Sequence, residues 1–274
     1  MTIFAWFKEK KEQWFHTRPP VIGLALSGGA TRGAAHIGVL QVLAREGIHP
    51  DIIAGNSAGA IVGAGYAAGV PVDTLSAMFR QLDWSSLVRP ALRERLGVFH
   101  TRPMEAFIEA HIGKKTFEEL PCRLAVVACD LLTGERVVLD KGSVAKAVRA
   151  SSAVPGVFTP VDLDGHLLVD GGVVDNFPVA LALEMGADYV IGVDVSFTNL
   201  LGHRPKNPVQ VLFAAMSIRS RRSLPDPSLV NCLIKPDISA YAGWDFEHAA
   251  EMEAAGRYAA EQALPQLKAD LGLL

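Results

Sequence analysis

Short apolar runs alternate along the chain with longer amphipathic segments. The runs are bounded by glycine, proline or polar residues, which is typical of buried strands, whereas apolar residues at intervals of three and four indicate helices. Strands are predicted at residues 21–26, 51–54, 124–129, 136–139, 167–169, 189–195 and 229–234. Helices are predicted between Gly33 and Gly47 and at residues 58–68, 75–96, 102–112, 144–151, 178–185, 209–222 and 246–267.

This alternation predicts an α/β fold, with a mainly parallel sheet flanked by helices on both faces. Ligands of such sheets bind beyond the carboxyl ends of the strands. The chain has 274 residues and contains no linker that would divide it, so residues 21–274 are expected to form a single domain. Residues 199–207 are polar, contain glycine and proline, and are predicted to form a mobile loop.

Residues 1–20 form an arm of different character. Phe4, Phe7 and Trp14 recur at helical spacing with lysines between them, and Pro19-Pro20 closes the arm. Such a segment is typical either of a short helix that lies on a lipid surface, here over residues 1–18, or of an arm that packs on the domain or on a partner subunit. The sequence leaves both interpretations open and does not define the oligomeric state.

Composition narrows the functional classes. Half of the residues are hydrophobic and the net charge is −3, which indicates a globular protein and gives no reason to expect a nucleic-acid partner. Three cysteines without a CxxC pair favour a reducing compartment, and the scattered histidines form no metal-binding motif. Without a clear signal peptide or an apolar run of membrane-spanning length, we expect a cytoplasmic protein, at most peripheral to the inner face of a membrane.

The first candidate for chemistry is the pentapeptide Gly55-Asn56-Ser57-Ala58-Gly59, which fits GxSxG. This motif places a serine on a sharp turn between a strand and a helix, where flanking glycines remove side chains that would clash. The helix that follows points its N-terminus at the site and favours developing negative charge. Because a predicted strand precedes the motif and a predicted helix follows it, Ser57 is a candidate nucleophile.

Two further glycine-rich turns follow predicted strands. The segment Ser27-Gly28-Gly29-Ala30-Thr31-Arg32-Gly33 offers backbone N–H groups that could stabilise an oxyanion. A nucleotide phosphate loop is the competing interpretation, but neither GxxxxGK[ST] nor GxGxxG is present. In Asp170-Gly171-Gly172 the two glycines allow a close turn that would expose a carboxylate, although an aspartate in this context is commonly a turn residue.

These three elements, in this order, resemble the patatin-like phospholipase family, and the runs Ala150–Phe158 and Asp175–Pro178 also look like its signatures. The resemblance spans about Val21 to Val195 and implies a three-layer α/β/α fold. It implies a Ser-Asp dyad, with Ser57 as nucleophile, Asp170 as base, and Gly28, Gly29 and neighbouring amides as the oxyanion site. Phospholipid or lysophospholipid esters are the implied substrates, without metal or organic cofactor.

Some alternatives stay open within this resemblance. The family usually has a third glycine where this chain has Ala30, and alanine resists positive φ, so the loop could be reshaped. The chain order Ser57, Asp170, then His203 or His248 would formally suit a catalytic triad. His36 is interpreted as a packing residue near the site, and His166 is placed in a hairpin turn. A soluble small-ester esterase or thioesterase and a non-catalytic lipid-binding or regulatory protein remain the rival functions.

Overall fold

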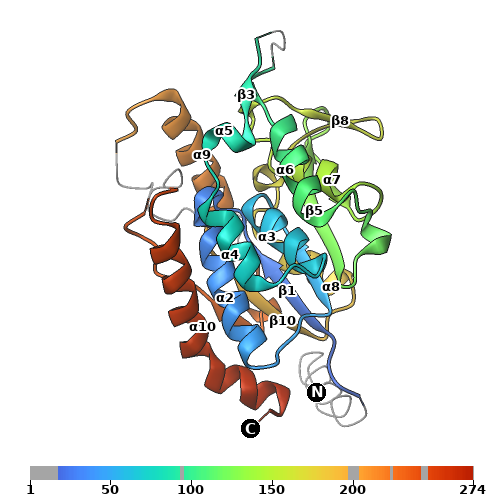
Figure 1. Ribbon diagram of the computed structural model, residues 1–274, viewed down its shortest axis with the longest axis vertical. Helices are drawn as coiled ribbons and strands as arrows, with labels where there is room; N and C mark the ends of the chain where they lie inside the picture. Colours follow the sequence, from blue (N-terminus) through green and yellow to red (C-terminus); the bar gives the residue numbers. More distant parts are fainter. Residues whose placement is uncertain (1–17, 93–95, 197–203, 223–224, 242–245, 274) are drawn as a thin grey trace.

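The computed structural model describes residues 18–92, 96–196, 204–222, 225–241 and 246–273 (Figure 1). At its centre is an eight-stranded sheet in the order β11-β10-β1-β2-β5-β9-β8, with β6 also paired to β5. Its strands are β1 (Ile22–Leu26), β2 (Ile52–Gly55), β5 (Arg123–Asp130), β6 (Arg136–Leu139), β8 (Val161–Leu163), β9 (His166–Asp170), β10 (Tyr189–Val193) and β11 (Cys232–Ile234).

The sheet is parallel over β11, β10, β1, β2 and β5 and antiparallel beyond β5. Strand β9 runs antiparallel to β5, and β8 and β9 form a hairpin whose turn holds Asp164 and Gly165 at positive φ. His166 is the first residue of β9, directly after that turn. The antiparallel pairing brings Asp170, the last residue of β9, opposite Ala128 in β5, close to the carboxyl ends of the parallel strands.

Helices cover both faces of the sheet, which confirms the predicted three-layer α/β arrangement. They are α2 (Ala34–Arg45), α3 (Ala58–Ala67), α4 (Val72–Arg80), α5 (Trp84–Leu87), α6 (Arg102–Ile112), α7 (Val144–Ser151), α8 (Val179–Glu184), α9 (Pro208–Arg222) and α10 (Ala249–Leu271). Alternate residues of the strands pack to opposite sides: Leu24 and Ile191 join α2, α3 and α10 in the larger core, whereas Ala25 and Val190 pack against α8. Among the described helices, none has both the length and the apolar composition needed to cross a membrane.

The helix expected over residues 75–96 is wrong. Helix α4 ends at Arg80, the short α5 follows, and β3 (Arg89–Pro90) then pairs antiparallel with β4 (Gly97–His100). Proline lacks the N–H that a helix interior needs, and Gly97 lies so close to the backbone of Phe158 that a Cβ there would be 2.5 Å from its carbonyl carbon. Strand β4 pairs in parallel with β7 (Gly156–Phe158), so β3, β4 and β7 form a second, small sheet that the sequence analysis missed.

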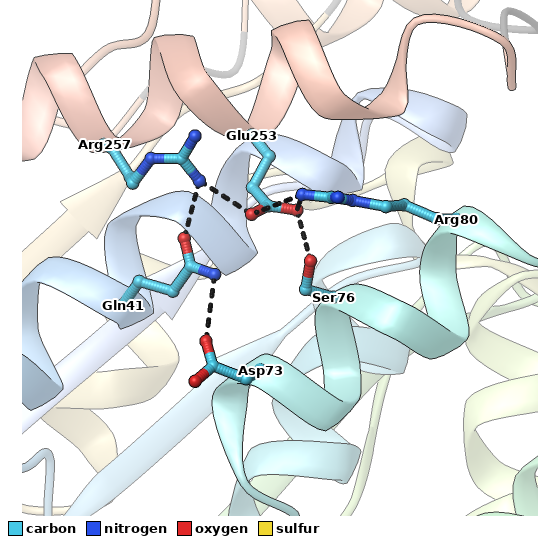
Figure 2. Close-up of polar contacts among 6 residues, drawn as sticks. All are labelled: Gln41, Asp73, Ser76, Arg80, Glu253 and Arg257. Carbon is cyan, nitrogen blue, oxygen red and sulfur yellow. Dashed lines mark hydrogen bonds and ion pairs between the residues drawn. The ribbon is translucent and has the colours of Figure 1, made fainter.

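Helices α2 and α10 cross at two glycines. A Cβ at Gly38 would collide with the Glu253 carbonyl, and one at Gly256 would collide with the Ala35 carbonyl. Beside this crossing the buried carboxylate of Glu253 accepts hydrogen bonds from Ser76 Oγ (2.6 Å) and Arg257 Nη1 (2.7 Å), and Arg80 completes its surroundings (Figure 2). Burial alone would raise the pKa of Glu253, but the Ser76 hydroxyl and the Arg80 cation outweigh it and lower the pKa, so the carboxylate joins α10 to α4 in its charged form.

Candidate active site

Ser57 lies on the turn between β2 and α3, as the GxSxG motif requires. Its backbone has φ 50° and ψ −116°, a left-handed conformation that side-chain-bearing residues seldom adopt. The flanking glycines are needed at this turn: a Cβ at Gly55 would lie 2.8 Å from the Gly59 carbonyl oxygen, and one at Gly59 would collide with the Leu26 carbonyl. The Ser57 N–H donates to Ser151 Oγ at 3.0 Å, which ties the turn to the end of α7.

The glycine-rich loop follows β1 and enters α2 through the short helix η1 (Ala30–Gly33). The Gly28 N–H donates to the Asn176 carbonyl at 3.0 Å, so it already has a partner within the fold. A Cβ at Gly28 would lie 2.5 Å from Asn176 Oδ1 and 2.7 Å from Asn56 Nδ2, which explains the glycine. Ala30 has φ 52°, so the alanine occupies the left-handed conformation that a glycine adopts more readily.

Two backbone amides of this loop remain as donors. Among the residues that the structure describes, nothing accepts a hydrogen bond from the N–H groups of Gly29 and Ala30. Both residues line the pocket that contains Ser57, together with Thr31 and Ala58. Gly33 lies farther along the loop, where a Cβ would be 3.0 Å from that of Ala58. The arrangement therefore leaves free amides beside a serine hydroxyl, which is what an oxyanion site needs.

Arg32 serves a different purpose from its neighbours in the loop. Its side chain is buried, and its guanidinium donates to the Tyr241 carbonyl at 2.7 Å and to the Ser196 carbonyl at 3.3 Å. Burial lowers the pKa of the Arg32 guanidinium, and the residue is not part of the pocket lining. Arg32 thus joins the glycine-rich loop to the segments that follow β10 and β11.

Asp170 ends β9 with a buried carboxylate. Its Oδ1 accepts a hydrogen bond of 2.7 Å from the Gly172 N–H and lies 3.4 Å from Asn56 Nδ2. Burial raises the pKa of Asp170 to about 6, and hydrogen bonds from Gly172, the Ser57 hydroxyl and Asn56 oppose this rise. A Cβ at Gly171 would lie 2.5 Å from the Val127 carbonyl oxygen, so the turn after Asp170 also needs its glycine.

Ser57 and Asp170 face the same pocket, whose remaining wall is largely apolar. Elements from distant parts of the sequence supply that wall, including Phe79 of α4, Met104 of α6, Phe158 of β7, Phe213 and Met216 of α9, and Phe246. Helices α4 and α6 both line this pocket. Residues 199–203 of the predicted mobile loop lie outside the described residues, and α9 forms another side of the pocket.

The described histidines do not line this pocket. His36 is fully buried behind the glycine-rich loop, with Nε2 at 2.9 Å from the Ser27 carbonyl, and burial lowers its pKa to about 4. His248 precedes α10, where its ring lies against that of Tyr241. His166 Nδ1 is 2.8 Å from Asp130 Oδ2, and His203 lies outside the described residues.

Three polar residues hold the turns together, and the sequence analysis assigned no role to two of them. Asn176 binds Asn56 Nδ2 through Oδ1 at 3.1 Å and also reaches the Gly28 carbonyl, whereas Ser151 lies between Ser57 N–H and Asn56 Oδ1. Asn56 is thus the hub of the group. The signal was present, because Ser151 and Asn176 fall in the two runs that resemble family signatures. Among the described residues, no group of three or more potential metal ligands is found.

Comparison with known proteins agrees with this geometry. The family profile of patatin-like phospholipases matches residues 24–183. An uncharacterized NTE family protein of Mycobacterium tuberculosis is 34% identical over 219 residues, which cover 78% of this chain and 60% of the relative. A neuropathy target esterase of Drosophila melanogaster is 32% identical over 64% of this chain and 13% of its own length. The chain therefore spans less than two thirds of the length of these relatives.

A solved structure supports the same fold. VipD from Legionella pneumophila superposes with a TM-score of 0.51 at 15% sequence identity, over 90% of this chain and 67% of that one. At this identity the likeness concerns the fold alone. The family profile, in contrast, includes all three glycine-rich turns and the residues that join them. The chain therefore belongs to the patatin-like phospholipase family.

Proposed function

We propose that this protein hydrolyses carboxylic esters of lipids, with Ser57 as nucleophile and Asp170 as its base. The observation that carries the proposal is the meeting of the two side chains in one apolar pocket. The Ser57 hydroxyl acts on the Asp170 carboxylate as a hydrogen-bond donor and lowers its pKa. A serine held at positive φ before a helix, next to a carboxylate in a pocket that none of the described histidines lines, is the arrangement that a Ser-Asp dyad requires.

The chemistry then proceeds in two balanced steps. Ser57 Oγ attacks the ester carbonyl carbon while Asp170 takes the hydroxyl proton, and the N–H groups of Gly29 and Ala30 stabilise the oxyanion. The intermediate collapses to acyl-Ser57, and the alcohol leaves with the proton from Asp170. A water molecule then attacks the acyl carbon, Asp170 accepts its proton, and the fatty acid departs as Ser57 regains a proton. The Gly28 N–H does not stabilise the oxyanion, because it already donates to the Asn176 carbonyl.

The raised pKa of Asp170 makes it suitable for this task. At a pKa of about 6 the carboxylate is mostly ionised at neutral pH, yet it is a stronger base than an exposed aspartate. Burial of the carboxylate is the main cause of the raised pKa.

The apolar wall supports a lipid acyl chain as the group bound beside Ser57. Relatives named as neuropathy target esterase and patatin-like phospholipase domain-containing protein are consistent with this class of substrate. We infer a phospholipid or lysophospholipid, because a pocket lined by Phe79, Phe213 and Phe246 would contribute little to binding a short-chain ester.

A fluorophosphonate probe tests the proposal directly, because it labels only an activated serine. Wild-type protein should be labelled at Ser57, and Ser57→Ala and Asp170→Asn should not react. Ser220→Ala is the matched control, since Ser220 lines the same pocket and its removal should leave labelling intact. Wild-type protein and Ser220→Ala should also hydrolyse micellar lysophospholipid, whereas Ser57→Ala and Asp170→Asn should not.

Further variants distinguish the dyad from its rivals. His36→Ala and His248→Ala should retain most activity once they are shown to be folded, and loss of labelling in folded His248→Ala would restore the triad. Absence of labelling in folded wild-type protein would favour a non-catalytic lipid-binding protein. Equal rates on monomeric and micellar esters would favour a soluble esterase.

A further inference from the structure

Exposed leucines mark the hairpin formed by β3 and β4. Leu92 has 93% of its surface exposed, Leu96 has 62%, and Val98 in β4 has 61%. Single exposed apolar residues are ordinary on protein surfaces, but a group of them on one projecting element commonly marks an interaction surface. Figure 1 shows this hairpin at one end of the molecule, away from the last turn of α10.

Helix α9 carries apolar residues on two faces. Phe213, Met216, Ser217 and Ser220 form the face that lines the active-site pocket. Val211 and Ile218, two turns apart, are 56% and 47% exposed on the outward side. A helix that only sealed the pocket would present polar residues outward, so the outer strip needs another explanation.

The hairpin and α9 lie at the same end of the molecule, and α9 lines the pocket. Figure 1 shows β3 and α9 at the end opposite the last turn of α10. The pocket is lined by α9 from one side, and from the other by Leu87 just before β3 and by Phe158 of β7, the strand that pairs with β4. The exposed apolar residues therefore lie on α9, which lines the pocket, and on a hairpin that adjoins two of its lining residues.

This end of the molecule is also basic. Residues 204–222 include Arg204, Lys206, Arg219, Arg221 and Arg222 and contain no aspartate or glutamate, although the whole chain has a net charge of −3. Arg204, Lys206 and Arg219 are exposed, as is Arg89 at the base of the hairpin. Apolar side chains surrounded by cations are complementary to an anionic lipid surface, which attracts the cations and accepts the apolar groups.

We propose that Leu92, Leu96, Val98, Val211, Ile218 and Arg219 form a docking surface for an anionic phospholipid bilayer. The proposal rests on the proposed lipid hydrolase function, and it explains how an acyl chain would reach Ser57 from the bilayer. With the docking surface seated in the headgroup region, the pocket would open toward the lipids without a membrane-spanning segment. None of these six residues belongs to the N-terminal arm.

Vesicle co-sedimentation of the full chain tests the docking surface. Wild-type protein should bind phosphatidylcholine vesicles that contain phosphatidylglycerol more tightly than phosphatidylcholine alone. The double variant Leu92→Ser/Leu96→Ser should lose binding to both by on the order of tenfold, because two large side chains no longer enter the lipid. Arg204→Gln/Lys206→Gln/Arg219→Gln should lose chiefly the preference for anionic vesicles. Tyr258→Ser is the matched control: Tyr258 is 65% exposed on α10, outside the pocket, and its loss should change nothing.

The readouts separate docking from catalysis. Fluorophosphonate labelling and hydrolysis of a monomeric ester should be unchanged in both surface variants, because neither touches Ser57 or Asp170. If wild-type protein bound vesicles but was not labelled, the proposed hydrolase function would be wrong and the docking proposal would stand. Wild-type binding equal to that of Leu92→Ser/Leu96→Ser, or a dimer in solution that this double variant dissociates, would overturn the docking proposal.

Discussion

The side-chain nitrogen of Asn56 lies 3.4 Å from Oδ1 of Asp170, so the turn that carries Ser57 also reaches the carboxylate on the opposing strand. The same amide nitrogen lies 3.1 Å from Asn176 Oδ1, and Asn56 Oδ1 lies 3.4 Å from Ser151 Oγ. One buried asparagine therefore joins the three turns that build the site. Residue x of GxSxG is here a positioning residue.

Replacing Asn56 with leucine should shift the acidic limb of the pH–rate profile upward. The change removes a donor that stabilises the charged form of Asp170, so the pKa of that carboxyl should rise above its present value of about 6, by about one unit. Because the base must be ionised to act, kcat/KM at pH 6 should fall more than kcat/KM at pH 8.

The control for this shift is Asn231→Leu, which removes an amide that accepts a hydrogen bond from the Val190 N–H far from the pocket. Its acidic limb should coincide with that of the wild type. A uniform loss of rate at every pH in folded Asn56→Leu would mean that Asn56 acts on geometry alone and leaves the pKa of Asp170 unchanged.

Asp170 and His36 should affect acid stability in opposite directions. As pH falls from 6 to about 4, folded Asp170 takes up a proton before its unfolded counterpart, which stabilises the fold. Over the same range unfolded His36 is protonated while the buried ring stays neutral, which destabilises the fold. Each contribution amounts to about 3 kcal/mol at full extent, so the two largely cancel in the wild type.

Single variants should reveal this cancellation. Relative to wild type, Asp170→Asn should lose unfolding free energy on acidification from pH 6.5 to 4, whereas His36→Gln should gain it. At pH 7.5 Asp170→Asn should be at least as stable as wild type, because a buried charge has been removed. Urea unfolding at several pH values measures both effects, and parallel curves for all three proteins would contradict the assignment.

Ala30→Gly should preserve or raise stability, which is unusual for an alanine-to-glycine change. Ala30 holds φ 52°, where a side chain costs about 1 kcal/mol and glycine costs nothing, so relief of strain offsets the greater freedom of unfolded glycine. Ala254→Gly, on an exposed position within α10, is the control and should cost about 1 kcal/mol. Thermal unfolding compares the two, and fluorophosphonate labelling should be retained in Ala30→Gly.

Gly38→Ala should destabilise the fold, although alanine is the better helix former. The added Cβ would collide with the Glu253 carbonyl. Because that group belongs to the backbone, no flexible side chain can move aside, and α2 and α10 must separate. We expect a loss of about 1–3 kcal/mol in unfolding free energy, against a gain of about 1 kcal/mol for the same change in an exposed helix. An unchanged or higher midpoint in urea would show that the helices separate freely.

Local pattern was sufficient for much of this protein. The strands at 22–26, 52–55 and 189–193 and the turn at Ser57 carry period and glycine signals that do not depend on distant residues. The sheet of β3, β4 and β7 has no such local signal, because it depends on the close contact between Gly97 and Phe158, which are far apart in sequence. The helical spacing of Leu75, Phe79 and Leu82 favoured a helix that continues past Arg80, whereas the structure ends α4 there and Pro90 cannot lie in a helix interior.

The candidate site divides in the same way. Ser57 and the glycines were identifiable because a tight turn leaves its own sequence signature. The sequence could not show which N–H groups of the glycine-rich loop are free to donate. Only the fold shows that the Gly28 N–H already donates to the Asn176 carbonyl. Likewise, the local sequence does not reveal that the Arg32 guanidinium is hydrogen-bonded to backbone carbonyls and does not act as a cation in the site.

Seven of the ten residues of helix α3, which follows Ser57, are glycine or alanine, and Gly59, Gly63 and Gly65 lie against neighbouring strands and side chains. Of its residues, Ala58 and Ile61 line the pocket. Most of the large apolar side chains of the wall come instead from α4, α6 and α9. Chain-length selectivity should thus be open to redesign at Phe79, Met104 or Phe213 while the hydrolytic machinery stays where it is.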